Sequence, residues 1–207
     1  PVLDVDVRAA DIAPAEAGLD TFSFMSDPNS DYNRYQYGLR AIRADAAWFQ
    51  GLTGEGTILA VIDTGVQSDH PFLAGKVLPG YNPDEPALGT EDWNGHGTHV
   101  AGIAAGVIHA GRGFTGIAPD AMILPIRVFN AGTASNWAHA MGLVIAADPS
   151  LVGLDLRAAD VANMSLGGPV YSLAVQDAVN FALDRNVVVV VSMGNSSNQA
   201  VRYPAAY

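Results

Sequence analysis

The sequence contains no cysteine and no apolar run long enough to cross a bilayer. The missing cysteines exclude disulfides, a zinc site built on thiolates and a thiol nucleophile. The missing apolar run excludes a membrane-spanning helix within these 207 residues. Basic residues are also scarce, since 10 lysines and arginines stand against 21 aspartates and glutamates, a net charge of −11. So acidic a chain repels a phosphate backbone, and we expect no nucleic-acid partner.

The first 37 residues differ in composition from the rest. They carry seven acidic residues against two arginines and show little sustained periodicity, which predicts an extended acidic arm over residues 1–37. Asp27, Asn29 and Asp31 place three oxygen ligands at alternate positions, so we consider them a candidate Ca²⁺ site. An EF-hand is excluded because Tyr32 and Gly38 stand where that loop needs Gly and Glu.

Beyond the arm, apolar segments typical of strands alternate with segments of helical periodicity. Strands bounded by helices predict an α/β fold with a doubly wound, mostly parallel sheet and helices on both faces. The most distinct strand is a run of valines at residues 187–191. We expect helices at 41–50, 97–106, 135–147 and 171–185, and strands at 57–62, 121–129, 160–165 and 187–191.

Polar residues follow several of these strands, at the edge of the sheet where parallel folds bind ligands. Asp63 ends the first strand, and His96 stands at the start of the next helix. A carboxylate beside an imidazole is the arrangement of a general base, in which the carboxylate fixes the tautomer. Read separately, Asp63 is also an ordinary turn residue and His96 an ordinary loop histidine.

Four segments resemble, in order and approximate spacing, those of subtilisin-like serine proteases, the subtilases. They are residues 61–66, 96–102, 163–168 and 194–195. The resemblance extends from about residue 38 to residue 207 and implies the N-terminal portion of a subtilisin-like catalytic domain. It implies that Asp63 orients the base, that His96 is the base, that Asn195 is an oxyanion donor and that His99 is structural.

The resemblance also implies where a polypeptide substrate binds. Ser165, Leu166 and Gly167 resemble the segment that pairs with the substrate backbone, and Gly194 belongs to the adjoining wall. Met193 departs from the family pattern, which has a small residue there. Because residues 165–168 and 192–196 carry no charge, we expect this region to prefer apolar or aromatic side chains.

The family's nucleophile lies in a Gly-Thr-Ser-Met-Ala segment, and nothing in this sequence matches it. We therefore expect this chain alone to be inactive and its sheet to be incomplete at the C-terminal end. The nucleophilic serine is expected on a C-terminal remainder of the same protein, which would be a partner of this chain.

Metal and compartment expectations also follow from the resemblance. Many relatives bind Ca²⁺ through an Asp after a His-Pro pair, but here Phe72 follows His70 and Pro71, so that site is expected to be lost. No cofactor is expected to be required. The chain starts without the features of a secretion signal, and the family implies a secreted bacterial enzyme whose signal has been removed.

Two alternatives remain open. One is a catalytically dead pseudoprotease, or a peptide-binding module, that kept the cleft and lost the nucleophile. The other is a metal hydrolase that uses Asp63, His96 and His99. The spacing of its two histidines differs from that of zincins, which place them four residues apart with a Glu beside the first.

Overall fold

The computed structural model describes residues 22–109, 111–130 and 132–207. Its centre is a sheet of four strands in the order β2-β1-β3-β4, and every neighbouring pair is parallel. The strands are β1 (Ile58–Asp63), β2 (Met122–Arg127), β3 (Val161–Met164) and β4 (Val188–Val191).

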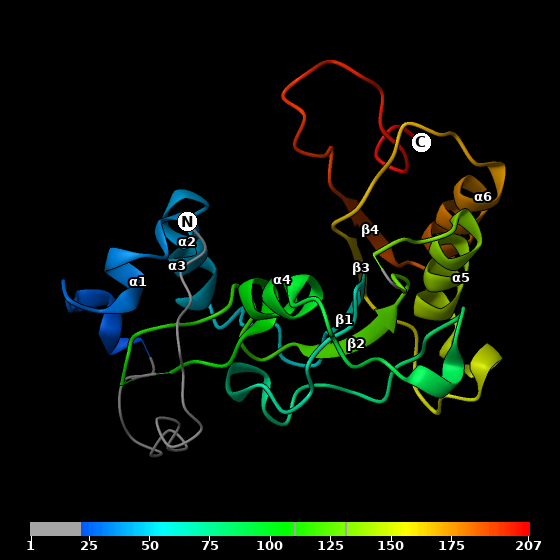
Figure 1. The fold of residues 1–207 in the computed structure, drawn as a ribbon. Coiled ribbons are helices and arrows are strands. Elements are labelled where there is room, and N and C mark those ends of the chain that lie inside the picture. The colour runs from blue at the N-terminus through cyan, green and yellow to red at the C-terminus, as the bar shows by residue number, and fades with distance from the viewer. Residues whose placement is uncertain (1–21, 110, 131) are drawn as a thin grey trace.

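Helices cover both faces of this sheet (Figure 1). Helix α4 (His96–Ala105) packs on one face against β1 and β2. Helices α5 (Asn136–Ala147) and α6 (Leu173–Leu183) pack against each other on the opposite face. The structure therefore confirms the predicted doubly wound α/β fold.

The core consists of two layers, one on each side of β1. Ala60 and Ile62 belong to the larger cluster under α5 and α6, whereas Val61 belongs to the smaller cluster under α4. All three side chains are fully buried. A strand buried on both faces has no polar alternation, which is why β1 reads as a continuous apolar run in the sequence.

The direction of winding reverses between β1 and β3. From β1 the chain passes through α4 to β2, and from β2 it passes through α5 to β3 on the other side of β1. Ligands of open parallel sheets bind beyond the carboxyl ends of strands at such a reversal. Asp63 ends β1 and Ser165 follows β3, so both lie at this position.

The predicted helix 41–50 is instead two short helices, α2 (Tyr37–Ala41) and α3 (Ala44–Trp48). Arg43 between them has a φ of 58°, which ends the first helix. In one continuous helix, Leu39 and Trp48 would lie on opposite sides, since nine residues at about 100° each give half a turn beyond two full turns. The break lets both side chains join one buried cluster.

The described part of the predicted arm is helical, which corrects the expectation of an extended segment. A 3-10 helix (Ser23–Ser26) and α1 (Asp31–Arg34) place Phe24 and Tyr32 in the cluster that contains Trp48. The aromatic spacing of this segment was missed because its burial depends on partners far along the chain. Residues 1–21 of the predicted arm lie outside the described residues.

The described residues also form three further 3-10 helices, Pro71–Leu73, Pro86–Leu88 and Pro149–Val152. Among the described residues, none of the helices has both the length and the apolar character needed to cross a membrane.

Helix α5 approaches the sheet closely at Gly142. A Cβ at this position would lie 2.8 Å from Ile62 Cγ2 and 3.2 Å from Val128 Cγ1. We expect Gly142→Ala to lower the free energy of unfolding by about 1–3 kcal/mol, because the added methyl forces the packed core apart. Urea unfolding of the whole protein measures this change.

Gly38→Ala is the matched control, since Gly38 is also helical but a Cβ there meets nothing within 4 Å. This variant should be more stable by about 0.5–1 kcal/mol through lower chain entropy in the unfolded state. Equal effects of the two substitutions would contradict the packing argument.

Candidate active site

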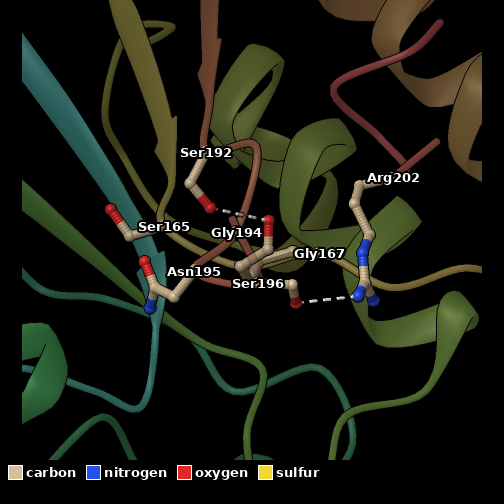
Figure 2. A pocket seen from close by; sticks show the side chains of 8 residues that line it. Ser165, Gly167, Ser192, Gly194, Asn195, Ser196 and Arg202 are labelled. Atoms are coloured by element: carbon tan, nitrogen blue, oxygen red, sulfur yellow. Dashed lines mark hydrogen bonds between the residues drawn. The ribbon is translucent and has the colours of Figure 1, made fainter. Parts of the chain in front are cut away.

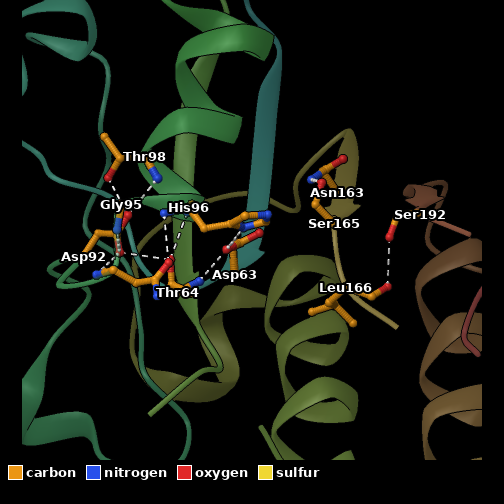
Figure 3. Close-up of polar contacts among 12 residues, drawn as sticks. Asp63, Thr64, Asp92, Gly95, His96, Thr98, Asn163, Ser165, Leu166 and Ser192 are labelled. Atoms are coloured by element: carbon orange, nitrogen blue, oxygen red, sulfur yellow. Dashed lines mark hydrogen bonds and ion pairs between the residues drawn. The ribbon is translucent and has the colours of Figure 1, made fainter. Parts of the chain in front are cut away.

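Asp63 and His96 form a hydrogen-bonded pair, as the sequence predicts (Figure 3). His96 Nδ1 lies 2.7 Å from Asp63 Oδ1, the Asp63 side chain is fully buried, and half of the His96 side chain is exposed. A carboxylate oxygen only accepts, so Nδ1 carries the proton and donates it to Asp63. The remaining ring nitrogen, Nε2, is therefore unprotonated in the neutral ring and can take up a proton.

The two oxygens of the Asp63 carboxylate differ in their hydrogen bonding. Oδ1 accepts hydrogen bonds from His96 Nδ1 and from the backbone N–H of Thr64, at 2.7 Å each. Oδ2 is buried and has no hydrogen-bond partner among the described residues. A buried carboxylate without full hydrogen bonding is costly, so the two bonds from His96 and Thr64 are what offset the burial of Asp63.

Two small contacts bring the start of α4 against the end of β1. A Cβ at Gly97 would lie 2.1 Å from the carbonyl oxygen of Gly65 and 3.1 Å from Asp63 Cβ, so only glycine permits this approach. The backbone N–H of Gly97 also donates to Thr64 Oγ1 at 2.9 Å. Together these contacts fix His96 next to Asp63.

Asp92 organises the turn before His96, a role that was not predicted from the sequence. One carboxylate oxygen accepts from the N–H groups of Asn94 and Gly95 and from Thr64 Oγ1, and the other accepts from the N–H and hydroxyl of Thr98. Burial raises the pKa of Asp92, but these hydrogen bonds outweigh it, so the pKa lies below its ordinary value. The signal that could have found it is an Asp that precedes Asn-Gly at a helix start.

His99 does not join the Asp63–His96 pair. It lies one turn further along α4 and is exposed. Nowhere in residues 22–109, 111–130 and 132–207 are three or more His, Cys, Asp or Glu side chains placed to hold a metal ion. The metal-hydrolase alternative therefore lacks a convergent set of ligands.

A pocket of about 260 Å³ lies beside the ends of β3 and β4 (Figure 2). It contains all four predicted substrate-binding residues together with Asn195. Asn195 is exposed, and its side chain makes no hydrogen bond to another described residue. The lining residues are Ser165, Leu166, Gly167, Ser192, Gly194, Asn195, Ser196 and Arg202.

Local structure explains the shape of this pocket. Gly194 has a φ of 83°, a conformation that glycine adopts without strain and that turns the chain sharply after β4. Asn163 Nδ2 donates to Ser165 Oγ at 3.0 Å, and Ser192 Oγ donates to the carbonyl of Leu166 at 3.3 Å. These bonds join the segments that follow β3 and β4.

The segments 165–168 and 192–196 are uncharged, as noted above, but the pocket also contains the positive charge of Arg202. Arg202 was missed because it lies outside the segments that the family resemblance covers by motif. Its position becomes evident only from the pairing of Tyr203 with Gly168.

The candidate calcium residues Asp27, Asn29 and Asp31 lie just before α1 and at its first residue, where Asp27 and Asn29 are exposed. The backbone N–H of Asn29 donates to Asp27 Oδ1 at 2.8 Å, and Asp31 begins α1. Phe72, at the expected position of a calcium ligand in relatives, is buried with its ring 4.5 Å from that of Phe114. The candidate Ca²⁺ site at Asp27, Asn29 and Asp31 stays a prediction.

Comparison with known proteins agrees with this arrangement. Residues 54–207 match the subtilase family. The chain belongs to this family.

Thermitase from Thermoactinomyces vulgaris is 43% identical to this subtilase chain over 182 residues, which cover 87% of the chain and 62% of thermitase. M-protease from Shouchella clausii (strain KSM-K16) is 38% identical over 212 residues, which cover 100% of the chain and 52% of that protein. The chain thus spans about half to three-fifths of the length of these bacterial relatives.

A solved structure supports the same assignment. The crystal structure of fervidolysin from Fervidobacterium pennivorans, described as a keratinolytic enzyme related to subtilisin, superposes on the subtilase chain with a TM-score of 0.72. The sequence identity is 33%, over 87% of this chain and 28% of fervidolysin. The fold and the family are therefore those that the sequence motifs indicate.

We expect Asp92→Asn to lower the free energy of unfolding at pH 7 by about 1–2 kcal/mol, the difference between charged and neutral hydrogen bonds. In this variant the side-chain NH₂ group would also lie against groups that donate hydrogen bonds, because both oxygens of Asp92 accept such bonds. Because the folded pKa of Asp92 is lowered, its stabilisation is complete above about pH 4 and is lost as the pH falls through the folded pKa.

Urea unfolding at pH 7 and near pH 3 measures this difference between variant and wild type. Asp177→Asn is the control, since Asp177 is exposed on α6, and it should change stability little at either pH. A loss of the same size at both pH values would contradict the role of the Asp92 charge.

Proposed function

We propose that this chain is part of a serine endopeptidase, in which it supplies the general base, the residue that orients it and one oxyanion donor. The observation that carries the proposal is the Asp63–His96 hydrogen bond of 2.7 Å at the reversal point of the sheet. Membership of the subtilase family supports it.

In this proposal His96 moves the proton in both halves of the reaction. Nε2 takes the proton of the serine hydroxyl as the serine oxygen bonds to the carbonyl carbon of the substrate, and it then gives that proton to the departing amine. A water molecule, deprotonated in the same way, hydrolyses the acyl-enzyme. Asp63 keeps Nδ1 protonated and stabilises the imidazolium that forms during the reaction.

Asn195 is the proposed donor to the negative oxygen of the tetrahedral intermediate. Its side-chain amide is exposed beside the pocket and not engaged by another described residue. The backbone turn at Gly194 (φ 83°) places Asn195 beside the pocket, and a donor held near the developing charge is how such groups lower a barrier.

The segment Ser165–Leu166–Gly167 is the proposed backbone-binding edge. It leaves β3 beside the pocket, where an extended peptide can pair with it as an added strand. Gly167 has no side chain to keep the substrate away, which favours a close approach of the two backbones.

We propose that the nucleophile lies on a C-terminal remainder of the same protein. Ser192 donates its hydroxyl proton to the carbonyl of Leu166, and no hydrogen bond joins Ser165 to His96 among the described residues. Val188 and Val190 on β4 are 56% and 48% exposed, an apolar face that suits cover by further chain. Coverage of 62% of thermitase is consistent with this.

The remaining proposals concern cofactors and location. The described chemistry requires no cofactor, and packing of Phe72 against Phe114 supports loss of the calcium site predicted from the family. Secretion from a bacterium is proposed on the basis of the bacterial relatives alone.

A fluorophosphonate that reacts with activated serines tests the proposed function in the full-length protein. Intact mass and peptide mapping should place the label on a serine outside residues 1–207, and His96→Ala should abolish labelling. Peptide binding without any labelling of the wild type would favour the pseudoprotease alternative, and a label on Ser165 or Ser192 would refute the assignment of the nucleophile.

Asn195→Ala should lower kcat by about 10²- to 10³-fold, the usual effect of one oxyanion donor, with KM nearly unchanged. Steady-state hydrolysis of a peptide p-nitroanilide measures both constants. Asn180→Ala, an exposed position on α6, is the control and should leave kcat unchanged. A rise in KM without a fall in kcat would contradict the oxyanion role.

A further inference from the structure

Arg202 is the charged residue among those that line the pocket beside Asn195, and the other lining residues are serine, glycine, leucine and asparagine. In Figure 2 its side chain extends toward Ser196, on the side of the pocket away from Ser165. The guanidinium donates to Ser196 Oγ at 2.9 Å. Four of its five N–H donors therefore remain available at this wall of the pocket.

The backbone holds Arg202 against the pocket. The next residue, Tyr203, exchanges two hydrogen bonds with Gly168, at 2.9 and 2.8 Å. A Cβ at Gly167 would lie 3.2 Å from the carbonyl oxygen of Tyr203, so the two segments are in close contact. Ring contacts of Tyr203 with Tyr171 and Tyr207 add to this anchoring.

The charge of Arg202 has no acidic partner within the described part of the chain. The ion pairs found there are Arg43–Asp45, His96–Asp63 and Arg157–Asp160. A partly buried guanidinium with free donors is suited to bind a carboxylate with two parallel hydrogen bonds.

The proposed role of Asn195 indicates which side chain of the substrate enters this pocket. If Asn195 binds the oxygen of the attacked carbonyl, the side chain nearest to it belongs to the residue that carries that carbonyl. This is the residue immediately before the scissile bond. Ser165, Gly194 and Arg202 line the same pocket as Asn195, so a side chain that enters the pocket from Asn195 meets Arg202 on its wall.

We infer that Arg202 makes this subsite selective for an acidic residue, Asp or Glu, immediately before the scissile bond. The inference rests on the proposed function and adds a substrate class to it. Charge-assisted hydrogen bonds to a carboxylate should favour Glu over the isosteric Gln by at least about tenfold.

The test uses the full-length protein and two peptide p-nitroanilides, succinyl-Ala-Ala-Pro-Glu and succinyl-Ala-Ala-Pro-Gln. The wild type should give a Glu-to-Gln ratio of kcat/KM of about ten or more, and Arg202→Gln should bring the ratio close to one. Arg185→Gln removes the same charge from the exposed end of the α6 segment and should leave the ratio unchanged. In the wild type, salt near 1 M should reduce the ratio by screening.

Binding provides a second measurement that does not require catalysis. In a His96→Ala background, fluorescence anisotropy of dye-labelled Ala-Ala-Pro-Glu amide and its Gln counterpart should show the same preference for Glu, lost in His96→Ala/Arg202→Gln. If wild-type protein cleaves neither peptide but binding prefers Glu, the proposed function fails and the inference on Arg202 stands. Equal binding of the two peptides, or a preference that persists without Arg202, overturns the inference.

Discussion

The buried carboxylate of Asp63 is the constraint on which the arrangement of the site depends. It lies at the end of a strand that is buried on both faces, and removal of a charge from water must be offset by hydrogen bonds. Thr64 and His96 provide these bonds on one oxygen only. The close contact at Gly97 and the turn that Asp92 organises both hold the imidazole of His96 beside the carboxylate of Asp63.

The winding of the sheet brings the two halves of the site together. The Asp63–His96 pair comes from the end of β1 and the start of α4, whereas the pocket comes from the segments after β3 and β4. Because β1 and β3 are neighbours but their crossover helices lie on opposite faces, the space beyond their carboxyl ends is not covered by either connection. This side is therefore the one from which the proposed peptide substrate would reach both His96 and the pocket.

The sequence was sufficient to predict the sheet, its helices and the Asp63–His96 pair, because buried parallel strands are apolar without interruption and polar residues that end them are conspicuous. It was insufficient for features that depend on distant partners. Asp92 accepts five hydrogen bonds, one of them from Thr64, which lies 28 residues earlier in the chain, and Arg202 reaches the pocket only because Tyr203 pairs with Gly168. The break between α2 and α3 likewise follows from the need to bury Leu39 and Trp48 in one cluster.

The helical packing of the N-terminal segment affects how readily a protease could cleave this segment. A peptide bond enters a cleft of the proposed kind only in an extended conformation, with its backbone N–H and C=O groups free to pair with the enzyme. Here the N–H groups of Asp31 and Tyr32 are bonded to the carbonyls of Arg112 and Gly113, and the ring of Tyr32 is buried beside Phe24. Proteolytic cleavage at this segment would first require it to unfold from the cluster around Trp48, so the contacts that stabilise the fold also protect this segment from cleavage by the proposed protease.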